Sequence, residues 1–252
     1  MMEFEEWCEA AAEVVNGHDL KVLSGSHDHL VAARDKVAEI VPTHYACEEH
    51  VARVLERLGK AEAADFVRQK LPESKAIRSG DLGEILATEY IAENTPYEVP
   101  IKRLRWKDHR NMAMRGDDVI GIEQNPENGR LKFLKSEAKN RSALPAGVLV
   151  EARAVLEKDG GLPSPHALSF VSERLMETGN RELADAIDDA QLKHGIAYGA
   201  SGSIQCLRPG ERMLIPRRAA KLFVSIVILK VEMHLCFRPT RRGSVVLKMS
   251  MI

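Results

Sequence analysis

The stretch LKFLKSEAKN, residues 131–140, begins as an apolar, strand-like run and ends with a carboxylate and an ammonium group two residues apart. Successive side chains of a strand point to opposite faces, so Glu137 and Lys139 are expected on the same face, where both reach one spot. The stretch therefore predicts a strand whose charged end is a candidate site.

Acid-x-Lys triplets arise easily by chance in a chain with this many charged residues, and two others lie at 19–21 and 73–75. The first is expected between helices and the second in a polar connection. The triplet at 137–139 instead ends an apolar strand candidate. The non-functional alternative is that Glu137 and Lys139 form a solvated ion pair at the surface.

A second strand candidate, DDVIGIE at 117–123, precedes the first and is joined to it by the turn-rich segment QNPENG. Pairing across that turn brings Asp118 near Glu137. Two converging carboxylates suit Mg²⁺ or Mn²⁺, which prefer oxygen ligands. Lys139 is then placed to orient or help deprotonate an attacking water and to offset charge on a phosphate.

Glu84 lies in a helix that is expected from about residue 82 to 93, ahead of the strands. In this position it is a further acceptor for metal-bound water. Its spacing from Asp81 also fits a capping box, in which Glu84 would hold the start of the helix. The two roles are compatible.

The pattern of the whole chain favours an α/β (α+β) fold with a mixed sheet flanked by helices. We expect a helical N-terminal region over residues 1–77 and a second domain over residues 78–252. Further strands are expected at 97–106 and within 221–235. The remaining helices are expected at 5–15, 30–41, 44–58, 60–71, 146–160, 165–179 and 181–195.

The composition is that of an ordinary globular protein, with 252 residues, 44% hydrophobic and 29% charged residues, and a net charge of −1. The near-neutral charge argues against a passive DNA coat protein. The longest apolar run is too short to span a bilayer, and no basic signal peptide is recognisable, so we expect a cytoplasmic protein with no membrane contact. Four scattered cysteines without a CxxC pair indicate reduced thiols.

Three segments together resemble a known family: GDLGEILATEYI at 80–91, MRGDDVIGI at 114–122 and LKFLKSEAKNRSAL at 131–144. Their order and spacing are similar to those of the PD-(D/E)xK nuclease core. More narrowly, they resemble the HamA family, the nuclease subunits of Hachiman antiphage defence systems, over roughly residues 78 to 235.

The resemblance implies a function as well as a fold. It makes Glu84 the helix acid, Asp118 and Glu137 the metal ligands with Glu84 in support, and Lys139 the catalytic lysine. It implies Mg²⁺- or Mn²⁺-dependent cleavage of DNA by a deoxyribonuclease. It also implies a superfamily-two helicase partner that restrains or activates the nuclease.

The sequence departs from the family pattern in two places. Asp117 and Asp118 are adjacent, so Asp117 is the alternative metal ligand, and Val119 replaces the small residue that usually follows the aspartate. The acids could also simply begin a strand beside a turn. The C-terminal segment CFRPTRRGSVVLKMSMI at 236–252 matches nothing in the pattern and is left unassigned.

A basic stretch follows the predicted helix, and its phosphate-binding candidates are Lys102, Arg103, Arg105, Lys107, Arg110 and Arg115. These residues would contact the DNA backbone in a salt-dependent manner without base specificity. Alternatively, they are the exposed charges of an edge strand. Trp106 is a candidate for base stacking, although core packing is the more common role of tryptophan.

Other patterns remain open. His27 with His29, and Cys47 with His50, lack the four-ligand spacing of a zinc site. The acidic helix expected at residues 1–16 is a solvated helix, a docking surface for a basic partner, or a guard over the nuclease face. A different functional class also remains: a non-catalytic subunit that binds DNA or regulates a helicase.

Overall fold

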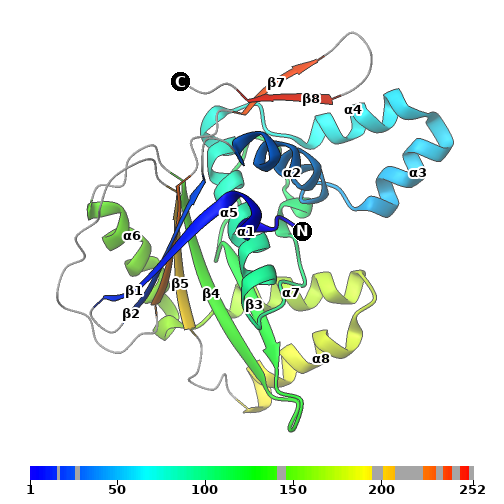
Figure 1. Cartoon of the computed structure of the whole chain (residues 1–252). Helices are drawn as coiled ribbons and strands as arrows, with labels where there is room; N and C mark the ends of the chain where they lie inside the picture. Colours follow the sequence, from blue (N-terminus) through cyan, green and yellow to red (C-terminus); the bar gives the residue numbers. More distant parts are fainter. Residues whose placement is uncertain are drawn as a thin grey trace.

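A computed structural model describes residues 1–15, 18–25, 29–140 and 146–194, together with the strands at 201–207, 224–230, 235–239 and 245–249. Its described part is a mixture of helices and strands built around one six-stranded sheet (Figure 1). The predicted α+β class with a mixed sheet is therefore confirmed.

The large sheet has the strand order β1-β2-β6-β5-β4-β3. Its four inner strands are parallel to one another, and β1 and β3 are antiparallel to their neighbours. Its strands are β1 (Cys8–Val15), β2 (His18–Gly25), β3 (Val119–Gln124), β4 (Leu131–Asn140), β5 (Ser201–Leu207) and β6 (Val224–Lys230). A separate two-stranded sheet pairs β7 (Leu235–Pro239) with β8 (Val245–Met249).

Helices cover both faces of the sheet. In Figure 1, α5 (Lys75–Asn94) and α6 (Ala146–Leu156) lie on opposite sides of β4, and both contact it. The other helical elements are α1 (Phe4–Trp7), α2 (Leu30–Thr43), α3 (Glu48–Leu58), α4 (Lys60–Lys70), α7 (Pro165–Glu177) and α8 (Arg181–Asp189), with short turns at η2 (Arg103–Trp106), η3 (Lys158–Gly161) and η4 (Ala190–His194).

The β3–β4 hairpin is packed from both sides, which fixes the direction of its side chains. Val119 and Leu134 face α5, where they contact Ala87 and Ile91. The alternate residues of the two strands, including Ile120 and Phe133, pack against α7 and α8. Since the period of a strand is two residues, Glu137 points to the same side of β4 as Phe133.

The N-terminal region is not wholly helical, which corrects two predictions. The helix expected at 5–15 is a single turn, α1, followed by strand β1, and the triplet at 19–21 lies in β2 rather than between helices. Alanine and glutamate favour helix locally, but pairing along the whole of β1 and β2 overrides that weak preference. The sheet thus takes strands from both sides of residue 77.

The strand expected at 97–106 is also wrong. Only Glu98 pairs there, in an isolated bridge to Ile122, and Arg103–Trp106 form a short 3₁₀ turn. Pro100 has no N–H to give to a ladder and helps to explain why the pairing stops. The predicted strands at 117–123 and 130–139 are confirmed as β3 and β4, and the helix around 82–93 as part of the longer α5.

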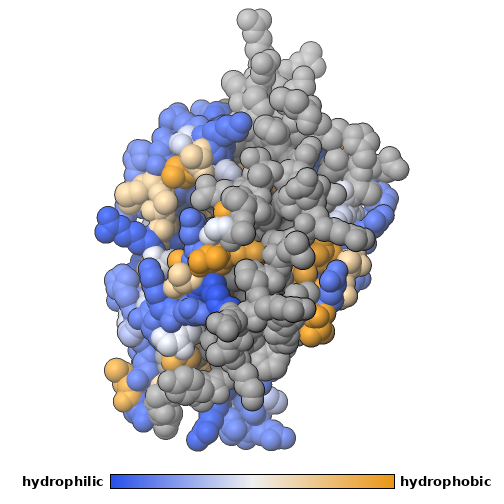
Figure 2. All heavy atoms as spheres, turned by 90° about the vertical axis from the view of Figure 1, so that its left-hand side faces the viewer, coloured by the Kyte–Doolittle hydropathy of each residue, from blue (hydrophilic) through white to orange (hydrophobic). Residues whose placement is uncertain are grey.

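On the side of the molecule shown in Figure 2, the described residues are mostly hydrophilic, with a few apolar side chains between them. Within the described part of the chain, none of the helices is both long and apolar enough to cross a membrane.

Candidate active site

The β3–β4 pairing brings two of the predicted carboxylates together. Val119 pairs with Ser136, so Asp118, one residue before β3, comes beside Glu137 on β4. The Oδ2 atom of Asp118 accepts a hydrogen bond from the backbone N–H of Ala138 at 2.9 Å. This bond ties the start of β3 to the charged end of β4.

Glu137 is 5% exposed, and its carboxylate accepts a hydrogen bond from the Nζ group of Lys139. The pKa of Glu137 is raised to about 7, chiefly by burial and then by the negative charge of Asp118, and the Lys139 ammonium opposes both effects. Glu137 is therefore poised to gain or lose a proton near neutral pH, as a carboxylate crowded by a second acid should be.

Glu84 lies within α5, which begins at Lys75 rather than beside Asp81, so the capping-box interpretation is wrong. Its carboxyl group is buried, and its pKa is raised to about 8, with burial as the largest cause. The Arg103 guanidinium lowers this pKa, whereas the charge of Asp118 raises it. Because the effect of Asp118 reaches Glu84, the helix acid and the strand acid belong to one electrostatic cluster.

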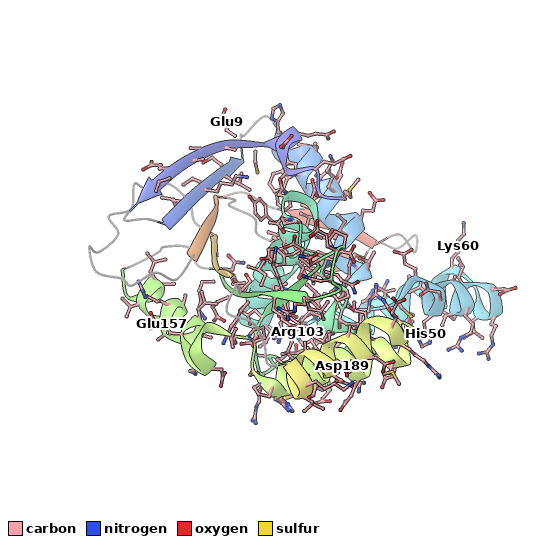
Figure 3. All side chains as sticks on the ribbon, turned by 90° about the horizontal axis from the view of Figure 1, so that it is seen from below. Glu9, His50, Lys60, Arg103, Glu157 and Asp189 are labelled. Atoms are coloured by element: carbon pink, nitrogen blue, oxygen red, sulfur yellow. The ribbon has the colours of Figure 1, made fainter. Side chains whose placement is uncertain are left out.

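Arg103 connects these acids. Its Nε donates to Oε1 of Glu84 at 2.8 Å, its Nη2 lies 3.7 Å from Oδ1 of Asp118, and its Nη1 donates to the carbonyl of Asp117. Figure 3 shows Arg103 in the middle of the molecule, whereas Glu9, Lys60 and Glu157 lie at the periphery. Sequence reasoning placed Arg103 among the DNA-binding residues, and the structure places it inside the acidic cluster.

Asp117 has a different environment from Asp118. Its Oδ1 lies 3.2 Å from Nζ of Lys135, and its Oδ2 accepts from the backbone N–H of Ser164 at 2.9 Å. Lys135 is 1% exposed and also donates to the carbonyls of Lys158 and Leu162. Asp117 and Lys135 thus anchor the segment that leads into α7, and Asp118 is the aspartate that faces Glu137.

Most of the other predicted DNA-binding residues are engaged within the protein. Lys102 pairs with Glu89 at 3.0 Å, Lys107 pairs with Asp81 at 2.6 Å, Arg110 pairs with Glu73, and Arg105 donates to the carbonyl of Thr43 at 2.9 Å. They do not form the exposed side of an edge strand. Arg115 is exposed, and its side chain makes no ion pair in the part of the chain that the structure describes.

Trp106 is half-buried and packs edge-to-face on Phe170, and its Nε1 donates to Glu177 at 3.2 Å. These contacts agree with the packing role that is the more common one for tryptophan. Of the N-terminal residues, Met2, Phe4 and Trp7 are buried in the core. His27 and the C-terminal segments between the strands lie outside the described residues.

Sequence reasoning missed a second buried ion pair next to Glu84. Lys107 and the hydroxyl of Tyr45 both contact Oδ2 of Asp81, one turn earlier on α5, and the Tyr45 hydrogen bond is 2.7 Å long. These two contacts tie the turn that follows α2 and the residue that follows η2 to the helix that carries Glu84. No local pattern indicates it, because the three residues come from separate parts of the chain.

The donors fit a hard divalent cation only in part. Asp118 and Glu137 converge with carboxylate oxygens, and Mg²⁺ accepts one or two carboxylates when water completes its shell. The pKa of Glu137 is raised chiefly by burial and further by the charge of Asp118, so the two acids share one environment. Across residues that the structure describes, no group of three or more His, Cys, Asp or Glu side chains is arranged to hold a metal.

The fold and the site define an α+β protein with a buried acidic cluster, which one arginine and one lysine partly neutralise, at the end of a β-hairpin. The chain belongs to the HamA family, whose sequence model matches residues 2–206. The resemblance inferred from the three motifs is therefore confirmed at the level of the family. The match also includes the N-terminal hairpin, which the motifs did not cover.

The chain is similar to the Hachiman protein HamA of Bacillus cereus, with 34% identity over 140 residues. The matched segment covers 56% of this chain and 48% of that protein. The chain thus spans about half the length of this curated relative.

Proposed function

We propose that this protein is a metal-dependent DNA nuclease on a PD-(D/E)xK core and the effector subunit of a Hachiman-type antiphage complex. The observation that carries the proposal is the convergence of Asp118, Glu137 and Lys139 at one end of the β3–β4 hairpin, with Glu84 joined to them through Arg103. Raised pKa values alone do not identify an active site, because ion pairs that only stabilise the fold also shift pKa values. The support for the proposal is therefore the geometry of the site together with membership of the family.

Asp118 and Glu137 would hold Mg²⁺ or Mn²⁺ through their carboxylate oxygens, with Glu84 in support. The cation would supply Lewis acidity toward the scissile phosphate and lower the pKa of bound water. Lys139 orients the attacking water and holds positive charge beside the phosphate. Arg103 contacts both Glu84 and Asp118, and in the proposed reaction it would also offset the charge that builds on the phosphate.

The partner belongs to the same proposal. The name of the Bacillus cereus relative places that protein in a Hachiman system, and the family resemblance implies a superfamily-two helicase that restrains or activates the nuclease. Because the match covers about half of that relative, the helicase partnership and the defence activity of this chain rest on the proposal.

Plasmid cleavage with Mg²⁺ or with EDTA tests the proposal. The variant is Glu137→Ala with Lys139→Ala, assayed alone and with the candidate helicase plus ATP. The matched control is Glu73→Ala with Lys75→Ala, which removes an acid-x-Lys triplet whose Glu73 and Lys75 side chains are exposed. Cleavage that needs metal, is lost in the first variant and persists in the control supports the nuclease.

A non-catalytic subunit that binds DNA or regulates a helicase is the second candidate. The observation in its favour is that Lys139 and Arg103 already contact the acids, as they would in a purely structural network. Full defence and unchanged DNA cleavage in the Glu137→Ala, Lys139→Ala variant of the complex would decide for this candidate.

A further inference from the structure

A pocket adjoins the acidic cluster on the side of α7. Arg103 and Asp118 belong both to its lining and to the cluster, so whatever enters the pocket lies next to the candidate metal ligands. Its apolar wall comes from the loop before η2, from β3 and from α7, and the side chains that form it include Ile101, Ile120, Ala167, Phe170 and Val171. His166, Arg115 and Gly116 are exposed and mark its mouth.

The pocket suits one flat, largely apolar group. It has room for about five water molecules, which is the bulk of a single nucleobase. A base pair is too wide for this space. Phe170, whose ring also contacts Trp106 edge-to-face and the Arg174 guanidinium, contributes an aromatic side chain to the lining, and aromatic stacking is how proteins bind bases without regard to sequence.

The charges around the pocket also fit a nucleotide. Asp117 and Asp118 are its acidic lining residues, and they are paired with Lys135 and Arg103 respectively. Arg115 lies at the mouth with an exposed side chain and is free to meet a phosphate. A nucleotide has both features: its base would contact the apolar wall, and its phosphate would lie at the mouth, beside Asp118 and Arg115.

We propose that this pocket binds an unpaired nucleobase of the DNA strand next to the phosphate that is cleaved. The inference rests on the proposed nuclease function and deepens it. It means that the substrate presents a base that has left the helix, as in single-stranded DNA, a frayed end or a flipped nucleotide.

Binding to short oligonucleotides, measured by fluorescence anisotropy in EDTA so that no cleavage occurs, tests the proposal with the full chain. Wild type is compared on single-stranded DNA, on the same strand with abasic residues, and on the duplex. We expect about tenfold tighter binding of the strand that carries bases than of the abasic strand, in the range that stacking one base supplies. Equal binding of the two strands would overturn the inference.

Two variants locate the effect. Ala167→Met fills the pocket and Phe170→Ala removes its aromatic wall, so both should bring binding of the normal strand down to the abasic level. The matched controls are Ala61→Met, at an exposed position on α4, and Phe66→Ala, on the same helix and away from the pocket. Circular dichroism and thermal melting check that each variant is folded. A base preference that survives in both folded pocket variants places the base elsewhere and refutes the pocket.

Magnesium-dependent plasmid cleavage by the same preparations separates this inference from the nuclease itself. Cleavage by wild type without a base preference would refute the pocket and leave the nuclease. A base preference that depends on the pocket, with no cleavage under any metal condition, would refute the nuclease and leave a base-binding subunit.

Discussion

Arg103 donates a hydrogen bond from Nε to Oε1 of Glu84 at 2.8 Å, and the two side chains are only 12% and 10% exposed. Taking both charges out of water is costly, and their attraction offsets that cost only while the pair is intact. The pair therefore holds η2 against α5 and keeps the helix acid of the candidate site in a defined position.

Arg103→Met should lower the free energy of unfolding by about 3 kcal/mol at pH 9, above the pKa of Glu84, because it leaves the buried Glu84 carboxylate without its cation. Adding Glu84→Gln to this variant should restore part of the lost stability. Urea unfolding measures the free energy of unfolding of the single and the double variant. Arg110→Met is the control, since Arg110 pairs with the exposed Glu73 at the surface and its loss should cost less than about 1 kcal/mol. Similar losses for Arg103→Met and Arg110→Met would contradict this account.

The two adjacent aspartates should respond differently to the same substitution. Asp118→Asn should abolish metal-dependent cleavage and weaken Mn²⁺ binding in a protein that still folds. Asp117→Asn should instead cost about 3 kcal/mol of stability, because it leaves the buried Lys135 ammonium without its carboxylate. Calorimetric titration with Mn²⁺ and urea unfolding of both variants distinguish them, and a stable Asp117→Asn protein without metal binding would reverse the assignment.

Metal binding should strengthen as the pH rises through about 7 to 8. The pKa of Glu137 is raised to about 7 and that of Glu84 to about 8, in both cases chiefly by burial, so below these values the carboxyl groups hold protons that a cation must displace. If one proton is displaced, the affinity for Mn²⁺ falls about tenfold for each pH unit below the pKa. An affinity that does not change between pH 6 and pH 8 would contradict the raised pKa values.

The same groups make the metal-free protein less stable at high pH. A carboxyl group whose pKa is higher in the folded than in the unfolded protein binds more protons when folded, so its contribution is favourable at low pH and is lost as the pH rises through the folded value. For Glu84 the window runs from its ordinary 4.5 to about 8. Glu84→Gln should flatten the fall in thermal stability across that window, and a slope equal to that of wild type would argue against it.

Gly121 and Gly80 differ in the space that is available for an added methyl group. A Cβ atom at Gly121 in β3 would lie 2.8 Å from Cβ of Tyr97 and 3.2 Å from Cβ of Leu134, so Gly121→Ala should cost about 1 to 3 kcal/mol. A Cβ atom at Gly80 in α5 meets nothing within 4 Å. Gly80→Ala should therefore stabilise the protein by about 0.5 to 1 kcal/mol through helix propensity. Thermal unfolding of the two variants checks both signs.

The hairpin and the long helix were predictable because each has a strong local signal. β3 and β4 are apolar runs separated by a turn-rich segment, and α5 combines helix formers with apolar residues at helical spacing. The N-terminal hairpin was not predicted, since Ala10, Ala11 and Ala12 favour helix and only the Asn-Gly dipeptide at 16–17 hints at a turn. The pairing of β2 with β6 could not be predicted from any short segment of sequence, because the two strands are far apart in the chain.

By itself, the sequence determined the acids and the lysine of the candidate site, their order along the chain and the family to which the chain belongs. It determined them because alternation along a strand and spacing along a helix are local properties. Only the tertiary structure decided that Arg103 lies among the acids, that Asp117 binds Lys135 while Asp118 faces Glu137, and that a pocket opens beside them. Those relations join residues from separate elements, and only burial in a common core selects the partner of each charge.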